Sequence, residues 1–314
     1  MSSTLADWRK ERLDRLARAG AEAGGVSLVR DAFQRLIRNP VAIVGAVIIA
    51  LFLLVAIFAP LLAPHDPYKE YLINQVQLGN SHIPGPQHGY PLGTDARGRD
   101  LLSRLIYGSR QTLFVGVIAT LIGLAFGILV GTVAGAFGGL VDGIAMRVVD
   151  VMLSLPGLLL AISLVALARH SSQWTVIFAV AMVNVPIFAR LLRGSMLAQR
   201  ESDHVLAARA LGVKQRSIVL RHMLPNSLSP VIVQATLTLA TAIIDAAALS
   251  FLGLGDPNPD RAEWGLMLGG DGQRFFAIRP ELAYYPALAI IIVALGFTLL
   301  GESMREALDP KNRR

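Results

Sequence analysis

Residues 112–137 decide the fold of this chain. They read Thr-Leu-Phe-Val-Gly-Val-Ile-Ala-Thr-Leu-Ile-Gly-Leu-Ala-Phe-Gly-Ile-Leu-Val-Gly-Thr-Val-Ala-Gly-Ala-Phe. No charged side chain interrupts them, and the stretch is longer than the ~20 apolar residues with which an α-helix crosses a hydrocarbon core. We therefore expect a membrane-spanning helix here.

Further apolar blocks of similar length lie on both sides of this stretch. They cover residues 40–63, 144–168, 174–192, 228–252 and 286–303. With 54% hydrophobic and only 16% charged residues in 314, the chain leaves little sequence for a separate soluble domain. We expect an all-α integral membrane protein of about six transmembrane helices.

The positive charge of the chain predicts its orientation. The net charge is +7, and under this assignment most of the 29 lysine and arginine residues fall on the side of both termini. Cytoplasmic segments carry this excess, so both termini are expected in the cytoplasm. The segments are then an N-terminal amphipathic part (1–39), a first span (40–63), an outer loop (64–111), a transmembrane core (112–303) and a cytoplasmic tail (304–314). Within the core, residues 198–226 form a cytoplasmic loop and residues 253–285 an outer loop.

The N-terminal part carries two apolar stripes at helical spacing. Leu5, Trp8, Leu13 and Leu16 form the first, with arginine and lysine residues among them. This pattern predicts a helix lying on the membrane surface, with a solvated charged tail as the alternative. The second stripe runs from residue 28 to residue 37 and ends at Asn39-Pro40.

Five glycines in the second span are spaced by four residues. A groove without side chains along one helix face allows close packing against another helix. Packing within the chain is the expected use, with a substrate path and a partner subunit as the alternatives. These glycines are Gly123, Gly127, Gly131, Gly135 and Gly139.

Four polar residues inside the apolar blocks are candidate functional positions, because such groups are costly in lipid. Arg147 and Asp150 are three residues apart, which predicts a structural ion pair. Asp245 has no local cation, so it is a candidate for the translocation pathway. Asn184 is a second candidate, because Pro186 two residues later could kink or unwind its helix.

The loop between the fourth and fifth spans has the pattern of a helical hairpin. Ser202 or Asp203 can cap a short helix, and Gly212 can end it in the left-handed conformation before Lys214 starts a second one. A small-faced hairpin at the membrane surface favours docking of another protein.

This loop resembles that of permease subunits of ATP-binding cassette (ABC) importers. Their pattern is Glu-Ala-Ala, three residues, Gly, nine residues, Ile, one residue and Leu-Pro. The matching residues are Ala207, Ala208, Gly212, Leu224 and Pro225. Leu206 and His222 depart from the pattern, since they stand where it has Glu and Ile.

Two outer segments sharpen the resemblance to dipeptide and oligopeptide permeases. Residues 92–104 read Leu-Gly-Thr-Asp-Ala-Arg-Gly-Arg-Asp-Leu-Leu-Ser-Arg, and Phe251-Leu252-Gly253-Leu254-Gly255 is followed by Glu263-Trp264-Gly265. The extended N-terminus is similar to that of the C-type subunit.

The resemblance implies a type I importer fold and a set of partners. It implies a heterodimer with a homologous permease chain, two cytoplasmic ATPase subunits or domains that bind ATP and Mg²⁺, and an extracytoplasmic solute-binding protein. The location implied is the bacterial inner membrane. The docking residues implied for the ATPases are Asp203, His204, Ala207, Ala208, Arg209, Gly212, Leu224 and Pro225. The transported solute stays open among dipeptides, oligopeptides, nickel complexes, glutathione and other small solutes.

Other function classes fit the sequence less well. None of the four lysines follows a glycine, so a P-loop is excluded and we expect neither catalytic residues nor a bound cofactor in this chain. With no cysteine and no His-Glu-x-x-His, no metal site is expected, and the arginines lack the pattern of a nucleic-acid face. Gly253-Leu254-Gly255-Asp256 has a form found in membrane aspartyl proteases, but a second carboxylate in a Tyr-Asp pair is missing. An ion-coupled carrier or channel that uses Asp245 and Asp150 remains the alternative.

Overall fold

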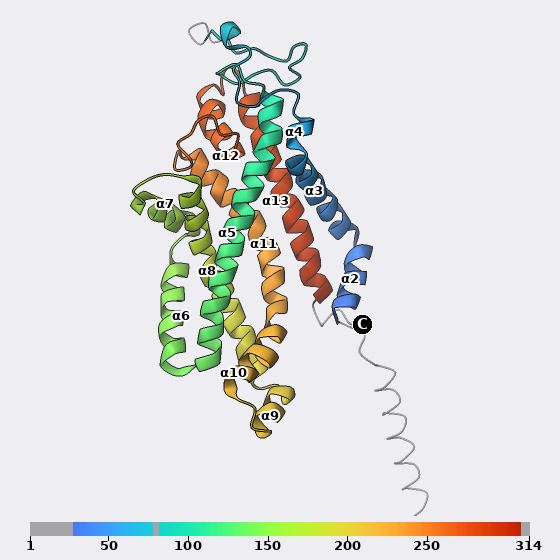
Figure 1. Ribbon diagram of the computed structural model, residues 1–314, viewed down its shortest axis with the longest axis vertical. Coiled ribbons are helices and arrows are strands. Elements are labelled where there is room, and N and C mark those ends of the chain that lie inside the picture. Colours follow the sequence, from blue (N-terminus) through green and yellow to red (C-terminus); the bar gives the residue numbers. More distant parts are fainter. Residues whose placement is uncertain (1–27, 78–81, 309–314) are drawn as a thin grey trace, which may run out of the picture.

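The structure, a computed structural model, describes residues 28–77 and 82–308, and its long helices run side by side along one axis (Figure 1). Five helices are long and apolar enough to cross a membrane. They are α3 (Pro40–Ile57), α5 (Leu101–Phe137), α8 (Gln173–Arg200), the stretch Gln215–Phe251 that ends in α11 (Leu224–Phe251), and α13 (Glu281–Leu308). A bent pair of helices adds a sixth crossing if it is counted as one span. The predicted all-α membrane architecture is confirmed.

Short elements connect these helices. The helix α2 (Leu28–Arg38) precedes α3, and α4 (Ala59–Leu62) follows it. The first outer segment holds η1 (Ile73–Gln75), and the second holds α12 (Trp264–Met267) and the π-helix η4 (Leu268–Gly272). The predicted stripe of Leu5, Trp8, Leu13 and Leu16 lies outside the described residues.

The third predicted span, 144–168, is not one helix. It is split into α6 (Gly139–Ser154) and α7 (Gly157–Leu167), which are bent by 99° relative to each other. Pro156 causes the break, because it has no N–H to donate and disfavours helical geometry in the residue before it. Leu155 accordingly has extended torsions, with φ −89° and ψ 139°.

The second span begins at Leu101 rather than at the expected Thr112. Asp100 caps the helix, since its Oδ2 accepts a hydrogen bond of 3.0 Å from the N–H of Ser103. At ~1.5 Å per residue, the 37 residues of α5 are longer than the hydrocarbon core is thick. The helix α5 is therefore longer than one straight crossing requires.

The other predicted boundaries differ by a few residues, because the first helix stops before its apolar block ends and the later helices run past theirs. The first span ends at Ile57, where Phe58 leaves helical geometry before α4. The helix α8 continues to Arg200, and α13 extends from Glu281 to Leu308, into the predicted outer loop and tail.

The helices α5 and α8 pack closely along the glycine groove. Gly123, Gly127, Gly131 and Gly135 are all buried against α8. A Cβ at Gly127 would lie 2.4 Å from the Cβ of Phe188, so only glycine permits this approach. Gly139 does not belong to the groove, because α5 ends at Phe137 and Gly139 starts α6 with φ +57°.

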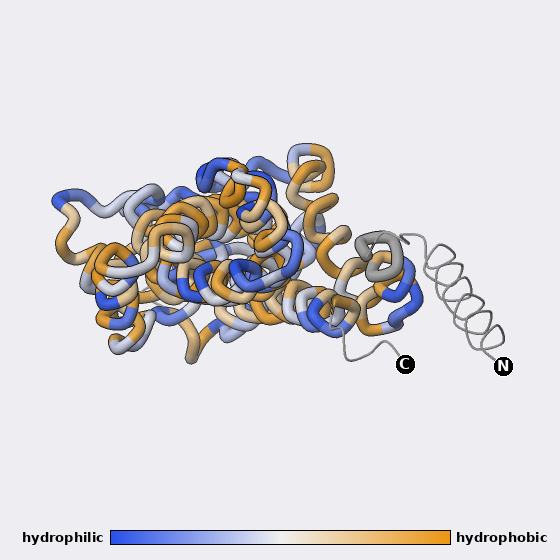
Figure 2. Tube along the Cα trace, turned by 90° about the horizontal axis from the view of Figure 1, so that it is seen from below, coloured by the Kyte–Doolittle hydropathy of each residue, from blue (hydrophilic) through white to orange (hydrophobic). Residues whose placement is uncertain are grey.

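Both ends of the described chain and the connection between α8 and α11 lie at the same end of the molecule (Figure 1). Seen from this end, apolar residues recur on the outward sides of the helices (Figure 2). Large hydrophobic side chains such as Val47 of α3, Phe126 of α5 and Ile291 of α13 are exposed there. This surface suits contact with lipid or with another membrane subunit.

Candidate functional site

The connection between α8 and α11 forms a hairpin that projects from one end of the molecule (Figure 1). It consists of α9 (Asp203–Ala210), a turn, and α10 (Gln215–Ser217). We call residues 203–217 the docking hairpin. Ser202 occupies the N-cap position of α9, but its hydroxyl donates to the carbonyl of Gln199 instead of capping the helix.

Gly212 ends α9 in the left-handed conformation, with φ +75°. The N–H of Gly212 donates to the carbonyl of Arg209 at 2.9 Å, and the N–H of Val213 donates to that of Ala208 at 3.1 Å. These two bonds form a Schellman motif, in which glycine is the preferred residue at this position. Lys214 then stands at the N-cap of α10, as the sequence predicts.

One side of α9 anchors the docking hairpin to the spans. Val205 and Ala208 are buried in a cluster with Met196 of α8 and Met223, which precedes α11. The hairpin is therefore packed as part of the helix bundle. Ala208 faces the core of the chain itself. A bulky charged residue at this position would therefore disturb the packing of α9 against the spans before it affected contact with a partner.

The opposite side of the hairpin is open. Asp203, His204 and Ala207 are exposed, and Arg209 is half-buried. Leu211, at the tip of the hairpin, is 84% exposed. Its apolar side chain is not stabilised by contact with water. This side offers a small apolar surface with mixed charges at its edge.

A π-helix joins the docking hairpin to α11. The segment η3 (Ile218–Met223) is wound more widely than an α-helix, and the N–H of Leu224 donates back to the carbonyl of Val219. Pro225 follows directly and has no N–H to continue the α-helical ladder. Leu224 is half-buried and Pro225 exposed, and both lie at the start of α11, past the docking hairpin as defined above. Pro225 instead borders an apolar groove of about 450 Å³ between α2, α11 and α13.

One face of α11 is only partly covered by the helices around it. Ile243 packs on Gly116 of α5, Leu237 packs on Gly301 of α13, and Ala246 packs with α8. The face between α8 and α13 carries Gln234, Thr238, Thr241 and Asp245. Thr241 is exposed, Gln234 and Asp245 are half-buried, and Thr238 is 2% exposed.

Two open cavities reach this face at the hairpin end of the bundle, with volumes of about 700 and 500 Å³. Leu191 of α8 and Pro230 and Gln234 of α11 line both of them. They place Gln234, at the hairpin end of the polar face, beside open space, while Thr238, Thr241 and Asp245 line neither cavity.

Asn184 does not reach that space. It is 2% exposed, its Cβ lies against the Gly123 position of α5, and its amide nitrogen has no hydrogen-bond partner among the described residues. The helix α8 also continues through Pro186, so the unwinding that we considered is absent.

The predicted ion pair between Arg147 and Asp150 is wrong. Asp150 pairs with Arg190 of α8, and Arg147 is exposed and makes no ion pair with any residue that the structure describes. A second pair joins Asp142 of α6 to Arg193 of α8 at 2.6 Å. The spacing of residues along α6 predicted that Asp150 pairs within that helix. Instead, α8 packs beside α6, and arginines of α8 pair with the acidic residues of α6.

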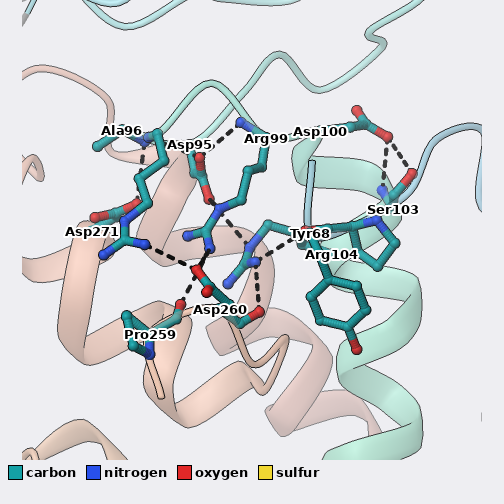
Figure 3. Close-up of polar contacts among 12 residues, drawn as sticks. Tyr68, Asp95, Ala96, Arg99, Asp100, Ser103, Arg104, Pro259, Asp260 and Asp271 are labelled. Atoms are coloured by element: carbon teal, nitrogen blue, oxygen red, sulfur yellow. Dashed lines mark hydrogen bonds and ion pairs between the residues drawn. The ribbon is translucent and has the colours of Figure 1, made fainter. Parts of the chain in front are cut away.

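At the opposite end of the molecule, two outer segments meet in a buried ionic cluster (Figure 3). The Nε of Arg99 donates to Oδ2 of Asp95 at 2.7 Å, and the Nε of Arg104 lies 3.2 Å from the same oxygen. These three residues are 3% exposed. Arg99 also reaches the carboxylate of Asp260 at 3.1 Å, so a buried arginine of the first segment is paired in the second.

Backbone groups complete this cluster. Arg104 donates to the carbonyls of Pro67, Asp260 and Arg261 at 3.1 to 3.3 Å. Asp271 of η4 accepts a bond of 3.2 Å from the N–H of Ala96, and burial raises the pKa of Asp271. Residues 64–77, 82–100 and 253–280 therefore form one unit, which we call the outer cap.

Glu263 lies in the outer cap, directly before α12. It is 4% exposed and accepts a hydrogen bond of 2.7 Å from the hydroxyl of Ser250. Burial raises the pKa of Glu263 to about 7, and the bond from Ser250 opposes this shift.

The chemistry of a protease or a metal enzyme is not assembled in the described residues. Asp256 pairs with Arg261 at 3.1 Å and accepts the N–H of Asn258, so Gly253–Asp256 is a turn. The described residues contain no cluster of three His, Cys, Asp or Glu side chains that could hold a metal ion.

Comparisons with known families match most of the chain. The family described as "Binding-protein-dependent transport system inner membrane component" matches residues 127–314. The family described as "N-terminal TM domain of oligopeptide transport permease C" matches residues 27–82.

Individual relatives match over nearly their full length. A dipeptide transport system permease protein from Alkalihalophilus pseudofirmus is 44% identical over 286 residues, which is 91% of each chain. A probable D,D-dipeptide transport system permease protein from Escherichia coli is 40% identical over 87% of this chain and 88% of its own. A glutathione transport system permease protein from Pectobacterium atrosepticum is 37% identical over 90% and 91%.

The fold is similar to that of a chain in the inward-facing MetNI methionine ABC transporter. The TM-score is 0.54 at 19% identity, and the match covers 66% of this chain and 96% of the other.

Proposed function

The chain belongs to the family of binding-protein-dependent transport system inner membrane components and is a C-type permease, and on this premise we propose how it works in an ATP-driven peptide importer. It forms half of the membrane pathway, and the docking hairpin couples it to cytoplasmic ATPase subunits. The observation that carries this proposal is the hairpin, which is packed into the spans through Val205 and Ala208 and exposed at Leu211.

The partners follow from the family. A homologous permease chain supplies the other half of the pathway, two ATPase subunits bind ATP and Mg²⁺, and a solute-binding protein delivers the solute to the outer cap. The docking hairpin, both chain ends and the ATPases lie in the cytoplasm of a bacterial cell. The excess of arginine and lysine on the side of the hairpin supports this orientation.

The proposed stroke begins at the docking hairpin. When the ATPases close around ATP, they move the exposed side of α9, and the packed side carries the movement to α8 and, through η3, to α11. The rigid α5–α8 unit turns with it, because the glycine groove locks the two helices together. Such a rigid-body movement opens the pathway to one face at a time.

Peptides are the proposed solutes. The three relatives are named as permeases for dipeptides, D,D-dipeptides and glutathione, all of which are small peptides or peptide-like compounds. The resemblance of residues 92–104 and 251–265 to peptide permeases agrees with this choice, and these two segments meet in the outer cap.

Co-purification tests the proposal. We would express this chain with its neighbouring open reading frames, purify it by affinity, and measure ATP hydrolysis of the solubilised complex. We expect an ATPase to co-purify, and Leu211→Arg or the bulky charged change Gly212→Arg to remove it or abolish its stimulation by solute-loaded binding protein.

Leu167→Arg is the matched control. Leu167 is 82% exposed against 84% for Leu211, but it is the last residue of α7, next to the start of α8, and the 28 residues of α8 span about 40 Å between that end and the hairpin. Loss of the ATPase with both variants, or with neither, would refute docking at the hairpin. Recovery of the chain with no ATPase at all would refute the importer.

A further inference from the structure

We propose that Asp245 binds the ammonium group of the peptide while it crosses the membrane, an inference that rests on the proposed function.

Asp245 is part of a polar stripe along α11. Gln234, Thr238, Thr241 and Asp245 are spaced by four, three and four residues, which places them on one narrow face of an α-helix. Within the stripe, Gln234 donates to the hydroxyl of Thr238 at 3.4 Å. The stripe extends from the open cavities at the cytoplasmic end toward the outer half of the helix.

The surroundings of α11 leave part of this face free, since Thr241 is exposed and Asp245 half-buried, whereas Thr238 is 2% exposed. The helices α5, α8 and α13 cover its other sides through Ile243, Ala246 and Leu237. A polar face with a carboxylate is costly against lipid, so it is expected to meet water or a polar partner. In half of a pathway, the partly uncovered polar face of a central helix is the part that meets the solute.

Asp245 also has no countercharge within the described residues. It is the one charged residue between Leu224 and Phe251, and it makes no ion pair. The acidic residues of α6 differ, since Asp142 and Asp150 are paired with Arg193 and Arg190. Asp245 is therefore available for a cation that arrives from outside the chain.

The proposed solutes carry such a cation. Dipeptides, D,D-dipeptides and glutathione differ in stereochemistry, linkage and carboxylate number, but all have a free amino group that is protonated at neutral pH. One carboxylate at a fixed place can serve them all, and the hydroxyl of Thr241 one turn away can accept a hydrogen bond from the same group.

The chain has no cysteine, which allows a direct test. A cysteine in place of Thr241 reacts with methanethiosulfonates that bear either a positive or a negative group. In the complete complex in lipid nanodiscs, we expect the cationic reagent to react faster, by about tenfold for unit charges one helical turn apart in water-like surroundings. Asp245→Asn in the same variant should bring the two rates together, and Asp245→Glu should keep the preference.

Val47→Cys on the lipid-exposed side of α3 is the control for reagents that enter through the bilayer, and we expect it to react with neither. Labelling after denaturation in detergent gives the total of reactive cysteine in each variant. Equal rates with both reagents, or a Thr241→Cys variant that reacts only after denaturation, would overturn the role of Asp245. Either result in a complex that still hydrolyses ATP would leave the importer assignment intact, so the two failures are distinguishable.

Discussion

At the scale of single residues, Glu263 combines a carboxylate with almost complete burial. Its pKa of about 7 means that the folded chain holds a proton that the unfolded chain, with an ordinary value of 4.5, releases at lower pH. The contribution of Glu263 to stability is therefore present below pH 4.5 and is lost as the pH rises through about 7.

We predict that Glu263→Gln makes the protein less sensitive to pH. Glutamine can still accept the bond from Ser250 but carries no charge at any pH. Between pH 5 and 8, wild type should lose up to about 3 kcal/mol more than the variant in the free energy of unfolding. Thermal unfolding of the purified protein across this range measures the difference. The exposed Glu70→Gln is the control, and equal pH dependence of wild type and Glu263→Gln would contradict the burial of an ionisable group here.

Asp95 and Asp260 allow a second test, because both pair with Arg99 but differ in burial. The side chain of Asp95 is 5% exposed and that of Asp260 is 52% exposed. Asp95→Asn leaves buried guanidinium groups without their charge partner, for which the expected cost is ~3–5 kcal/mol. Asp260→Asn should cost at most ~1 kcal/mol.

Limited proteolysis of the outer cap, followed with urea, measures these two costs. The cap of the Asp95→Asn variant should be cut at a much lower urea concentration than that of the Asp260→Asn variant. The same sensitivity in both variants would show that the cluster does not hold the cap together.

At the scale of elements, the contact between α5 and α8 depends on the absence of side chains. We predict that Gly127→Ala forces the two helices apart at Phe188 and destabilises the protein by ~1–3 kcal/mol, as overpacking does. Gly143→Ala on α6 is the control, because nothing lies within 4 Å of a Cβ there. Melting temperatures of the two purified variants give the comparison, and an unchanged value for Gly127→Ala would contradict the close packing.

Elements whose determinants lie along one helix could be predicted from the sequence. The spacing of Gly123 to Gly135 predicted a groove, and Gly212 predicted the end of α9, because both are local properties of the chain. The break at Pro156 was missed, although proline and the residue before it disfavour a helix, since the apolar block runs across it without interruption. The stripe from Gln234 to Asp245 was visible in the sequence at helical spacing, but only its last residue was singled out.

Contacts between distant segments could not be predicted. Asp150 pairs with Arg190 and not with Arg147, and which arginine is closer depends on how α6 packs against α8. The arginines of residues 92–104 looked like part of a family pattern, yet their partners lie in residues 259–261, more than 150 positions along the chain. Likewise, Ala207 and Ala208 match one motif, but only the packing of α9 shows that Ala208 faces inward.

At the scale of the whole molecule, the chain presents two structured ends joined by long helices (Figure 1). The outer cap is tied together by buried ion pairs, and the docking hairpin is fixed to α8 and α11 by apolar packing. Both α8 and α11 are continuous helices of 28 residues, and on the proposed function they transmit a movement of the hairpin across the membrane. The polar face of α11 lies along this proposed route.

The measurement that tests this account most directly is uptake of a labelled dipeptide into proteoliposomes that contain this chain, its homologous permease and the ATPases. We predict uptake only when ATP is present on the hairpin side and solute-loaded binding protein on the side of the outer cap, with loss of uptake in Leu211→Arg and not in Leu167→Arg. Uptake driven by an ion gradient without ATP would contradict the account and identify the chain as an ion-coupled carrier.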